Sequence, residues 1–538
     1  MKFMKLGLNP DTFYTEDATR TVISDVPTDL TIRIDGITYL LHKSCLVPKC
    51  GLLQRLFSEK DEGGDVSVEL HDIPGGEEAF ELCAKFCYGI TISLSAHKFV
   101  AALCAASFLR MTEKVENGNL IAKLEAFFSS CILQAWKDSL IALHNAERLC
   151  DWSQNLGIVR RCIESIVDKI LTPPTKVKWS YTYTRPGYVR KRRDSVPKDW
   201  WTEDLSCLGI DMFSSIVTTI TSTNMLQPRL IGEALHVYAH CWLLNASEGS
   251  PGSKRRVLET IVRLIPAEKG SVSIKFLLRL LTTANSLGAS PVSKAQLLRL
   301  CGLQLDDATL NDLSQSDIDL VKTVVRSFLR QWKRRNSAGE GQPLRAMHKV
   351  GNLIDSYLQV VAKDARMPAQ KMVALIETLP ATARPQHNHL YKAINIYLKE
   401  HPEVSKADKK QLCSFLDCQK LSPEVRSHAV KNERLPLRTV VQVLFFDHEK
   451  TNASSQQLQR DDLSKLKVSS SAGNGTRPKA AGALHRSSRK LDDKPELSQE
   501  LSFKVKLETE KEKKRETAAA PQLNPHNKPQ IRGVYIKR

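Results

Sequence analysis

The sequence contains no run of about eighteen apolar residues, so we expect no membrane-spanning helix. The first residues, MKFMKLGLNPDTF, lack the apolar core of a secretory signal peptide. Lysine follows Met1 where myristoylation needs glycine, and the last residues, VYIKR, offer no cysteine for prenylation. These absences lead us to expect a cytoplasmic chain without a lipid anchor.

Signatures of catalysis are also missing. Neither common phosphate-binding glycine loop is present, and no serine, histidine and acid stand together in a recognisable catalytic context. His236 and His240 are spaced as metal ligands on one helix face often are. No glutamate follows His236 and no third ligand is evident, so helix packing is the better interpretation. We therefore expect a protein that is not an enzyme and that holds no metal or cofactor.

The cysteines give no sign of a disulfide framework. There are 13 of them, an odd number, scattered through apolar segments. Cys83 with Cys87, and Cys413 with Cys418, are spaced as metal or redox pairs can be, but no partner motif accompanies either pair. We interpret the cysteines as small core residues in a reducing compartment.

The net charge of +19 is concentrated in two segments. Residues 176–198 carry +7 and residues 450–538 carry +10, which leaves the rest of the chain close to neutral. A basic groove for nucleic acid is therefore not expected on a folded domain. Basic segments of this kind suit an anionic membrane surface, nuclear import or control by phosphorylation. We expect peripheral contact with the plasma membrane, and the nucleus is the alternative compartment.

The basic cluster Arg190-Lys191-Arg192-Arg193 has three interpretations. The first is a solvated loop. The second is a phosphorylation site at Ser195, because arginines stand before this serine where a basophilic kinase reads them, and the product would resemble a ligand of 14-3-3 proteins. The third is a nuclear localisation signal.

Two other residues are candidates for phosphorylation. Ser337 follows Arg334 and Arg335, which repeats the kinase half of the pattern at Ser195. Tyr391 lies in the stretch LYKAINIYLK, where a tyrosine at helical spacing is usually a core residue.

Residues 27–110 predict an α+β domain. Leu30, Ile32 and Ile34 alternate with polar residues and indicate a strand. Asp35-Gly36 is a two-residue hairpin turn, and Ile37–Leu41 returns as the second strand. A third strand is expected at Val66, Val68 and Leu70, followed by a helix in which Phe80, Cys83, Ala84 and Cys87 share one face.

The remaining segments predict helices and flexible connections. Between Leu379 and Glu449, His401-Pro402 ends one helix, Ser422-Pro423-Glu424 starts another, and Leu435-Pro436 precedes a last one. The tail is too polar to bury a core of its own. We divide the chain into an N-terminal arm (1–26), the α+β domain (27–110), a helical linker (111–171), a basic loop (172–198), a helical domain (199–450) with polar gaps at 245–254 and 333–343, and a disordered basic tail (451–538).

Several stretches closely resemble one plant family. LYKAINIYLKEHP, CQKLS and NERLPLRTVVQVLFF resemble the C-terminal part of the non-phototropic hypocotyl and root phototropism-like family. DLTIRIDGITYLLHKSCLVPKCGLLQRLF and IPGGEEAFELCAKFCYG resemble its BTB/POZ domain. Further matches lie at Asp199–Phe213, Ile231–Leu243, Leu264–Ser290, Gln304–Leu313 and Asp355–Asp364. The resemblance covers most of residues 27–450 and implies a multidomain protein, with a BTB/POZ domain, an all-α domain and a mobile tail.

The resemblance implies a function without catalysis. Members of this family are thought to be substrate adaptors of cullin-RING ubiquitin ligases, in which the BTB domain binds the cullin and the helical domain or tail binds the substrate. The alternative is a plasma-membrane scaffold that works with receptor kinases in light or auxin responses, independently of ubiquitin. A transcriptional regulator is a third class, which the near-neutral folded part argues against.

One position departs from the pattern of animal BTB domains. Those domains usually carry an aspartate and histidine pair after the second strand, whereas here His42 and Lys43 stand there without the aspartate. BTB domains commonly form homo- or hetero-oligomers, and this departure leaves the geometry of such an oligomer open.

Overall fold

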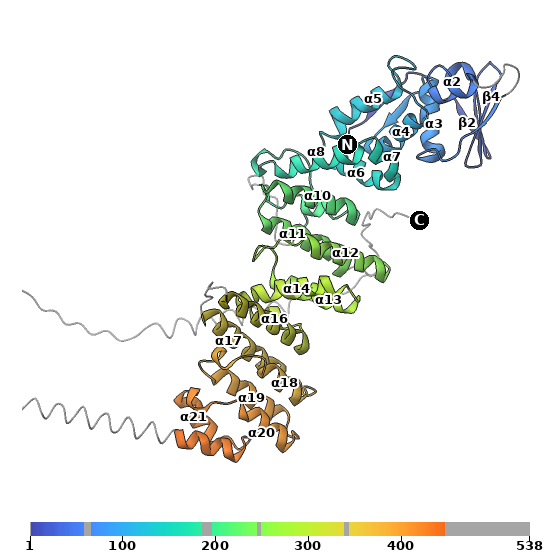
Figure 1. The fold of residues 1–538 in the computed structure, drawn as a ribbon. Helices are drawn as coiled ribbons and strands as arrows, with labels where there is room; N and C mark the ends of the chain where they lie inside the picture. Colours follow the sequence, from blue (N-terminus) through green and yellow to red (C-terminus); the bar gives the residue numbers. More distant parts are fainter. Residues whose placement is uncertain (1, 59–65, 186–195, 245–248, 338–343, 447–538) are drawn as a thin grey trace, which may run out of the picture. The chain divides into compact units, whose positions relative to one another are not determined.

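The computed structural model describes residues 2–58, 66–185, 196–244, 249–337 and 344–446 (Figure 1). All of these residues fall within one compact unit, residues 1–456. The predicted tail, the cluster Arg190–Arg193 and Ser195 lie outside the described residues. None of the described helices is long and apolar enough to cross a membrane.

A mixed five-stranded sheet forms the core of the N-terminal part, in the order β2-β3-β5-β4-β6. Its strands are β2 (Phe13–Glu16), β3 (Thr19–Val22), β4 (Leu30–Ile34), β5 (Ile37–Leu41) and β6 (Val66–Glu69). A separate pair joins β1 (Met4–Leu6) to β7 (Ile92–Leu94). The predicted α/β character of this region is thus confirmed.

The predicted hairpin of β4 and β5 is present. Leu30, Ile32 and Ile34 are all buried, as their alternation predicted. Asp35 and Gly36 both have positive φ, 48° and 87°, which is the left-handed backbone that a tight two-residue hairpin turn requires. Register along the two strands runs from Leu30 opposite Leu41 to Ile34 opposite Ile37.

The segment predicted as an N-terminal arm, residues 1–26, supplies three strands. β3 pairs in parallel with β5, and β1 pairs with β7, so that Met4 lies opposite Leu94 at one end of the pair. Strands of three or four residues carry too little alternation to be recognised from sequence. Their stability comes from partners that are distant in the chain.

Helices cover this sheet and continue into the segment predicted as a linker. The first group is α1 (Lys43–Leu46), α2 (Gly51–Ser58), α3 (Gly76–Cys87) and α4 (Ala96–Phe108). The second is α5 (Leu120–Phe127), α6 (Trp136–Ala146), α7 (Cys150–Asn155) and α8 (Ile158–Leu171). Phe99 of α4 stacks on Phe128 just after α5 at 4.7 Å, and α6 contacts both α4 and α8. The two groups therefore share one core.

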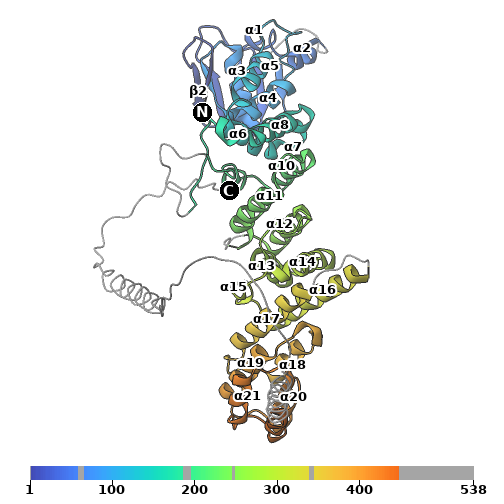
Figure 2. The ribbon, with the colours of Figure 1, turned by 90° about the vertical axis from the view of Figure 1, so that its left-hand side faces the viewer.

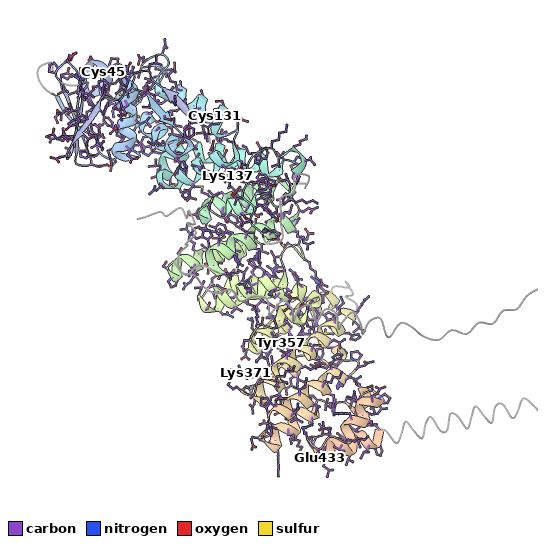
Figure 3. All side chains as sticks on the ribbon, turned by 180° about the vertical axis from the view of Figure 1, so that it is seen from behind. Cys45, Cys131, Lys137, Tyr357, Lys371 and Glu433 are labelled. Carbon is purple, nitrogen blue, oxygen red and sulfur yellow. The ribbon has the colours of Figure 1, made fainter. Side chains whose placement is uncertain are left out.

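A buried tryptophan cluster joins this part to the helices that follow. Trp136 and Trp200 lie with ring centroids 4.6 Å apart, and the indole N–H of Trp136 donates to Asp204 at 2.7 Å. Lys137, labelled in Figure 3, also contacts the Asp204 carboxylate. Such a junction fixes the two regions against each other, because separating them would expose two indoles and leave a buried carboxylate without donors.

The described residues before 186 in the segment predicted as a basic loop pack against neighbouring elements. Trp179 and Tyr181 lie against Trp200, at 5.7 and 5.5 Å between ring centroids. Arg185 forms an ion pair with Asp199 at 2.7 Å. Trp179 and Tyr181 lie among the lysines and arginines of this segment and bury apolar surface against Trp200.

The remaining helices form two rows (Figure 2). α10, α12, α14, α16, α18 and α20 each contact the next member of that series, and α13, α15, α17 and α19 do the same. The helices are α9 (Thr202–Leu205), α10 (Ile210–Thr223), α11 (Pro228–Ala239), α12 (Pro251–Leu264), α13 (Ile274–Ser286), α14 (Pro291–Gln304), α15 (Leu310–Leu313), α16 (Ile318–Ser337), α17 (Leu344–Val361), α18 (Ala369–Ile376), α19 (Asn388–Glu400), α20 (Lys406–Ser414), α21 (Pro423–Val430) and a terminal helix at 437–446.

The helix boundaries expected near the C-terminus are confirmed. α19 ends before His401-Pro402, α21 begins at Pro423 after Ser422, and the terminal helix follows Pro436. Helices extend into both of the segments predicted as polar gaps, 245–254 and 333–343. α12 begins at Pro251 with Ser250 as its N-cap, and α16 runs on to Ser337, since a helix of lysine and arginine can extend beyond the core at little cost.

Candidate functional site

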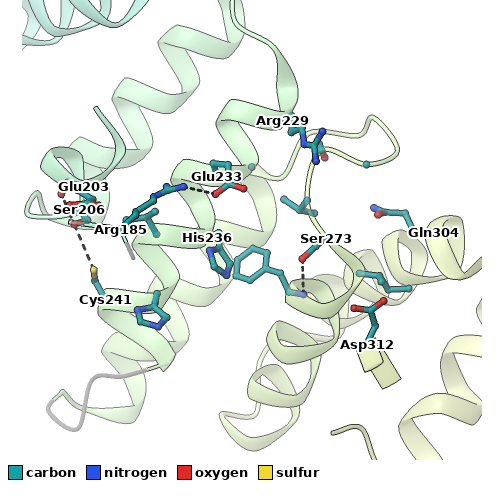
Figure 4. A pocket seen from close by; sticks show the side chains of 18 of the residues that line it. Arg185, Glu203, Ser206, Arg229, Glu233, His236, Cys241, Ser273, Gln304 and Asp312 are labelled. Carbon is teal, nitrogen blue, oxygen red and sulfur yellow. Dashed lines mark hydrogen bonds and ion pairs between the residues drawn. The ribbon is translucent and has the colours of Figure 1, made fainter. Parts of the chain in front are cut away.

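A cleft of about 920 Å³ opens in the helical region beside α11 (Figure 4). Its walls come from segments that are far apart in sequence: residues 182–185, α9, α11, the turn before α13, and the ends of α14 and α15. The volume is of the size that holds a ligand of several residues or a large small molecule.

Gly232 sets how closely α11 approaches the neighbouring turn. A Cβ at this position would lie 1.8 Å from the carbonyl oxygen of Ser271, so only glycine permits this contact. The turn itself is held by the Ser271 hydroxyl, which donates to the carbonyl of Pro266 at 3.1 Å. The two backbones meet at the base of the cleft, and the flanking side chains form its walls.

The carboxylates of the cleft already have donors from this chain. Glu203 accepts from the backbone N–H of Thr184 at 2.8 Å, and Glu233 pairs with Arg185 at 3.4 Å. The two other carboxylates lie at the far wall. Asp307 pairs with Lys269 at 2.9 Å, and Asp312 accepts from both the backbone N–H and the hydroxyl of Thr309, at 2.8 and 2.7 Å.

Two donors of the cleft have no such partner among the described residues. The side chain of Gln304 is only 7% exposed, yet its amide makes no hydrogen bond there and points into the cleft (Figure 4). Arg229 is exposed and forms no ion pair or hydrogen bond within the described part of the chain. Ser273 and Ile274, the N-cap and first residue of α13, line the cleft beside them.

The two histidines of α11 also line this cleft. The His236 ring meets Phe276 edge-on at 5.0 Å, and burial lowers the pKa of His236 below its usual 6.5. His236 is therefore neutral at pH 7. The ring centroids of His236 and His240 are 6.5 Å apart, and no cluster of three metal-binding side chains occurs among the described residues. The sequence pattern drew attention to both histidines but gave no sign of the cleft that they share.

The cysteine pairs singled out in the sequence are core residues. Cys83, Cys87, Cys413 and Cys418 are all buried. Burial raises the pKa of Cys413 to about 12, which keeps the thiol protonated and unreactive. The neighbour of Cys87 that sequence spacing missed is Cys50, with the two sulfur atoms 3.9 Å apart.

Of the phosphorylation candidates, Tyr391 is the one whose side chain the structure describes. It is 3% exposed, and its hydroxyl is within 2.7 Å of His428 Nδ1 and 3.1 Å of the Asn432 amide. A kinase cannot reach this hydroxyl in the folded chain, so Tyr391 is a structural residue. Ser337 is the last residue of α16.

His42 and Lys43, where the sequence departs from animal BTB domains, form hydrogen bonds with other parts of the N-terminal region. His42 is buried between the Tyr88 hydroxyl and the Val26 carbonyl, each at 2.9 Å. The backbone N–H of Lys43, at the start of α1, donates to Asp29 at 2.7 Å. Asp29, located before β4, thus accepts a hydrogen bond from the first residue of α1.

Comparison with known proteins places the chain in a family. Residues 199–425 match the model of the NPH3 family. A BTB/POZ domain-containing protein of Arabidopsis thaliana is 56% identical, over 84% of this chain and 85% of its own length. The chain belongs to the NPH3 family. The matched NPH3 segment begins before α9 and includes the whole of the cleft's α11, α13, α14 and α15.

Two other Arabidopsis thaliana relatives bear names from phototropism. The phototropic-responsive NPH3 family protein NPY1 is 40% identical, over 84% of this chain and 83% of its own length. Root phototropism protein 3 is 33% identical, over 82% of this chain and 77% of its own length. No solved structure matches this NPH3-family chain.

Proposed function

We propose that this NPH3-family protein is a substrate adaptor of a cullin-RING ubiquitin ligase in plant signalling. The N-terminal α/β region would be a BTB/POZ domain that binds the cullin, and the helical rows would bind the target protein. The observation that carries this proposal is the joining of two dissimilar regions, a sheet domain and a helical region with an open cleft, through one buried junction. Relatives named for their BTB/POZ domain support the assignment of the first region.

The junction suits the physical task of an adaptor. An adaptor forms no bond itself but raises the local concentration of target lysines near the ubiquitin carrier. That gain is largest when the spacing between the two binding sites is fixed. Trp136, Trp200 and Asp204 pack the end of the N-terminal part directly onto the start of the helical rows, and these contacts hold the two parts together.

The relatives also favour a role in light signalling. Two of them are named for phototropic responses, and this chain matches both over more than four fifths of its length. Within the proposal, the protein works in the cytoplasm and at the inner face of the plasma membrane. Receptor kinases and 14-3-3 proteins are the partners expected there, through the basic segments and Ser195 and Ser337.

Co-purification with a plant cullin tests the proposal. Ile32 is fully buried in β4, so Ile32→Asp places an unpaired charge in the sheet core and should abolish both the fold of this region and cullin binding. Ile23→Asp is the matched control, because Ile23 is 69% exposed. A well-folded full-length chain that binds no plant cullin would overturn the adaptor proposal and leave the ubiquitin-independent scaffold.

A further inference from the structure

We infer that the cleft beside α11 binds an extended acidic peptide of a partner protein. Arg229 would face a carboxylate of that peptide, and the amide of Gln304 would pair with its main chain. The inference rests on the proposed function in one respect: we take the partner protein to be the target that the adaptor presents to the ligase. Binding itself is a property of the cleft.

The balance of hydrogen-bond donors in the cleft indicates the charge of its ligand. The lining holds four carboxylates and two arginines, a count that by itself would favour a basic ligand. Arg185 and Lys269 pair with Glu233 and Asp307, and neutral donors of this chain hold Glu203 and Asp312, which keep their charge. Arg229, by contrast, has no partner among the described residues. The Arg229 guanidinium is therefore free to bind a ligand, and a carboxylate is the group that it binds most favourably.

Gln304 is the second and independent indication. A polar side chain that is nine-tenths buried normally makes hydrogen bonds, because leaving it unsatisfied is costly. The Gln304 amide makes no hydrogen bond within the described structure and faces the cleft, where its nitrogen and oxygen are accessible to a ligand. A carboxamide carries both a donor and an acceptor, which matches the N–H and C=O of an extended main chain.

The start of α13 reinforces the preference for negative charge. Ser273 caps this helix of 13 residues by accepting from the N–H of Phe276 at 3.2 Å. The first backbone N–H groups of the helix have no intrahelical acceptor, and the helix dipole places partial positive charge at this end. Ser273 and Ile274 line the cleft together with Arg229 and Gln304.

The size and apolar part of the cleft favour a peptide over a single small anion. A volume of about 920 Å³ far exceeds that of a phosphate or acetate ion. Val237, Val272, Ile274 and Phe276 offer apolar wall between the polar groups. An extended segment can place an acidic side chain at Arg229 and apolar side chains along this wall.

Selection from a displayed library of random octapeptides tests the inference, with the full-length chain as bait. The variants are Arg229→Gln and Gln304→Met. The matched control is Arg263→Gln on α12, an exposed arginine that likewise has no partner among the described residues and lies outside the cleft. Melting temperatures of all four chains establish that each is folded.

The unmodified chain and Arg263→Gln should enrich peptides with Asp or Glu at a fixed position. For a resynthesised peptide of this kind, Arg229→Gln should weaken binding roughly tenfold or more, since a hydrogen bond to a charged group is lost. Gln304→Met should weaken binding and keep the acidic preference. Three results would each overturn the inference. They are enrichment of basic peptides, no enrichment at all, and acidic peptides that bind Arg229→Gln as tightly as the unmodified chain. No step uses a cullin, so its outcome is independent of the adaptor test.

Discussion

At the scale of single residues, Arg384 and Asp355 form an ion pair in the interior of the helical rows. Their side chains are 6% and 1% exposed, and Arg384 Nε donates to Asp355 at 2.9 Å. A second donor of Arg384 reaches the carbonyl of Ile376 at 3.1 Å. Burial raises the pKa of Asp355, and the guanidinium opposes that rise. The Asp355 carboxylate therefore depends on the Arg384 guanidinium to remain charged in a dry site.

Arg384→Met should destabilise the protein by about 3–5 kcal/mol, because it leaves Asp355 buried without its partner. The double variant with Asp355→Leu should recover much of that loss. Arg256→Met is the surface control, since Arg256 and Asp211 pair at 2.8 Å but are 66% and 70% exposed, and it should cost less than about 1 kcal/mol. Denaturant unfolding measures all three, and equal midpoints for Arg384→Met and Arg256→Met would contradict this account.

His387 should make stability depend on pH. Burial, with Lys420 and Arg384 nearby, lowers the pKa of His387 from 6.5 to about 4, and Asp417 opposes this. The unfolded chain therefore binds a proton before the folded chain does. Stability should fall as pH decreases from 6.5 towards 4, by up to about 1.4 kcal/mol per pH unit.

The control for this effect is His387→Asn. The Nδ1 atom of His387 accepts from the backbone N–H of Asp417 at 3.0 Å, and an asparagine oxygen can replace that acceptor without titrating. The difference between the unfolding free energies at pH 6.5 and pH 5 should be smaller in this variant than in the unmodified protein. The same pH slope in both proteins would show that other groups cause it.

At the scale of elements, the close approach of α11 to the turn before α13 shapes the cleft. Gly232→Ala should destabilise the protein by about 1–3 kcal/mol, because the new Cβ would lie 1.8 Å from the Ser271 oxygen. Gly252→Ala in α12 is the matched control. Nothing lies within 4 Å of its Cβ, so it should stabilise by up to about 1 kcal/mol. Thermal unfolding compares the two, and equal effects would rule out the tight contact.

Elements with a strong local pattern could be predicted, and those made by distant pairing could not. The alternation of Leu30, Ile32 and Ile34 and the breakers around α19 and α21 carry their information within a few residues. β1 depends on β7, and no local signal reports that pairing. The cleft is assembled from separate helices and turns. No local sequence pattern around Gln304 therefore predicts that its side chain lines a cleft.

At the scale of the whole molecule, charge is distributed unevenly. Residues 176–198 and 450–538 carry +17 of the net +19. Each Lys or Arg close to an anionic leaflet contributes roughly 1 kcal/mol of attraction. Not all of these cations are available, because Arg185 is held by Asp199 and ten acids lie within residues 450–538.

Sedimentation with vesicles that contain anionic lipid should detect membrane binding by these segments. Binding should decrease with added salt, with deletion of residues 451–538, and with aspartate at Ser195 and Ser337, since each change reduces the electrostatic attraction. Aspartate at the exposed Ser314 serves as a control for added charge elsewhere. Vesicle binding that does not change with added salt, with the deletion or with the serine substitutions would exclude an electrostatic mechanism.

Transfer of ubiquitin within one complex tests the adaptor account most directly, because it needs no knowledge of the natural target. An acceptor protein with exposed lysines is fused to the C-terminus of the full-length chain and incubated with a reconstituted plant cullin-RING ligase. The account predicts ubiquitin on the fused acceptor, loss of transfer with Ile32→Asp, and retention with the exposed-site control Ile23→Asp. Transfer to the fused acceptor no faster than to the free acceptor would contradict it.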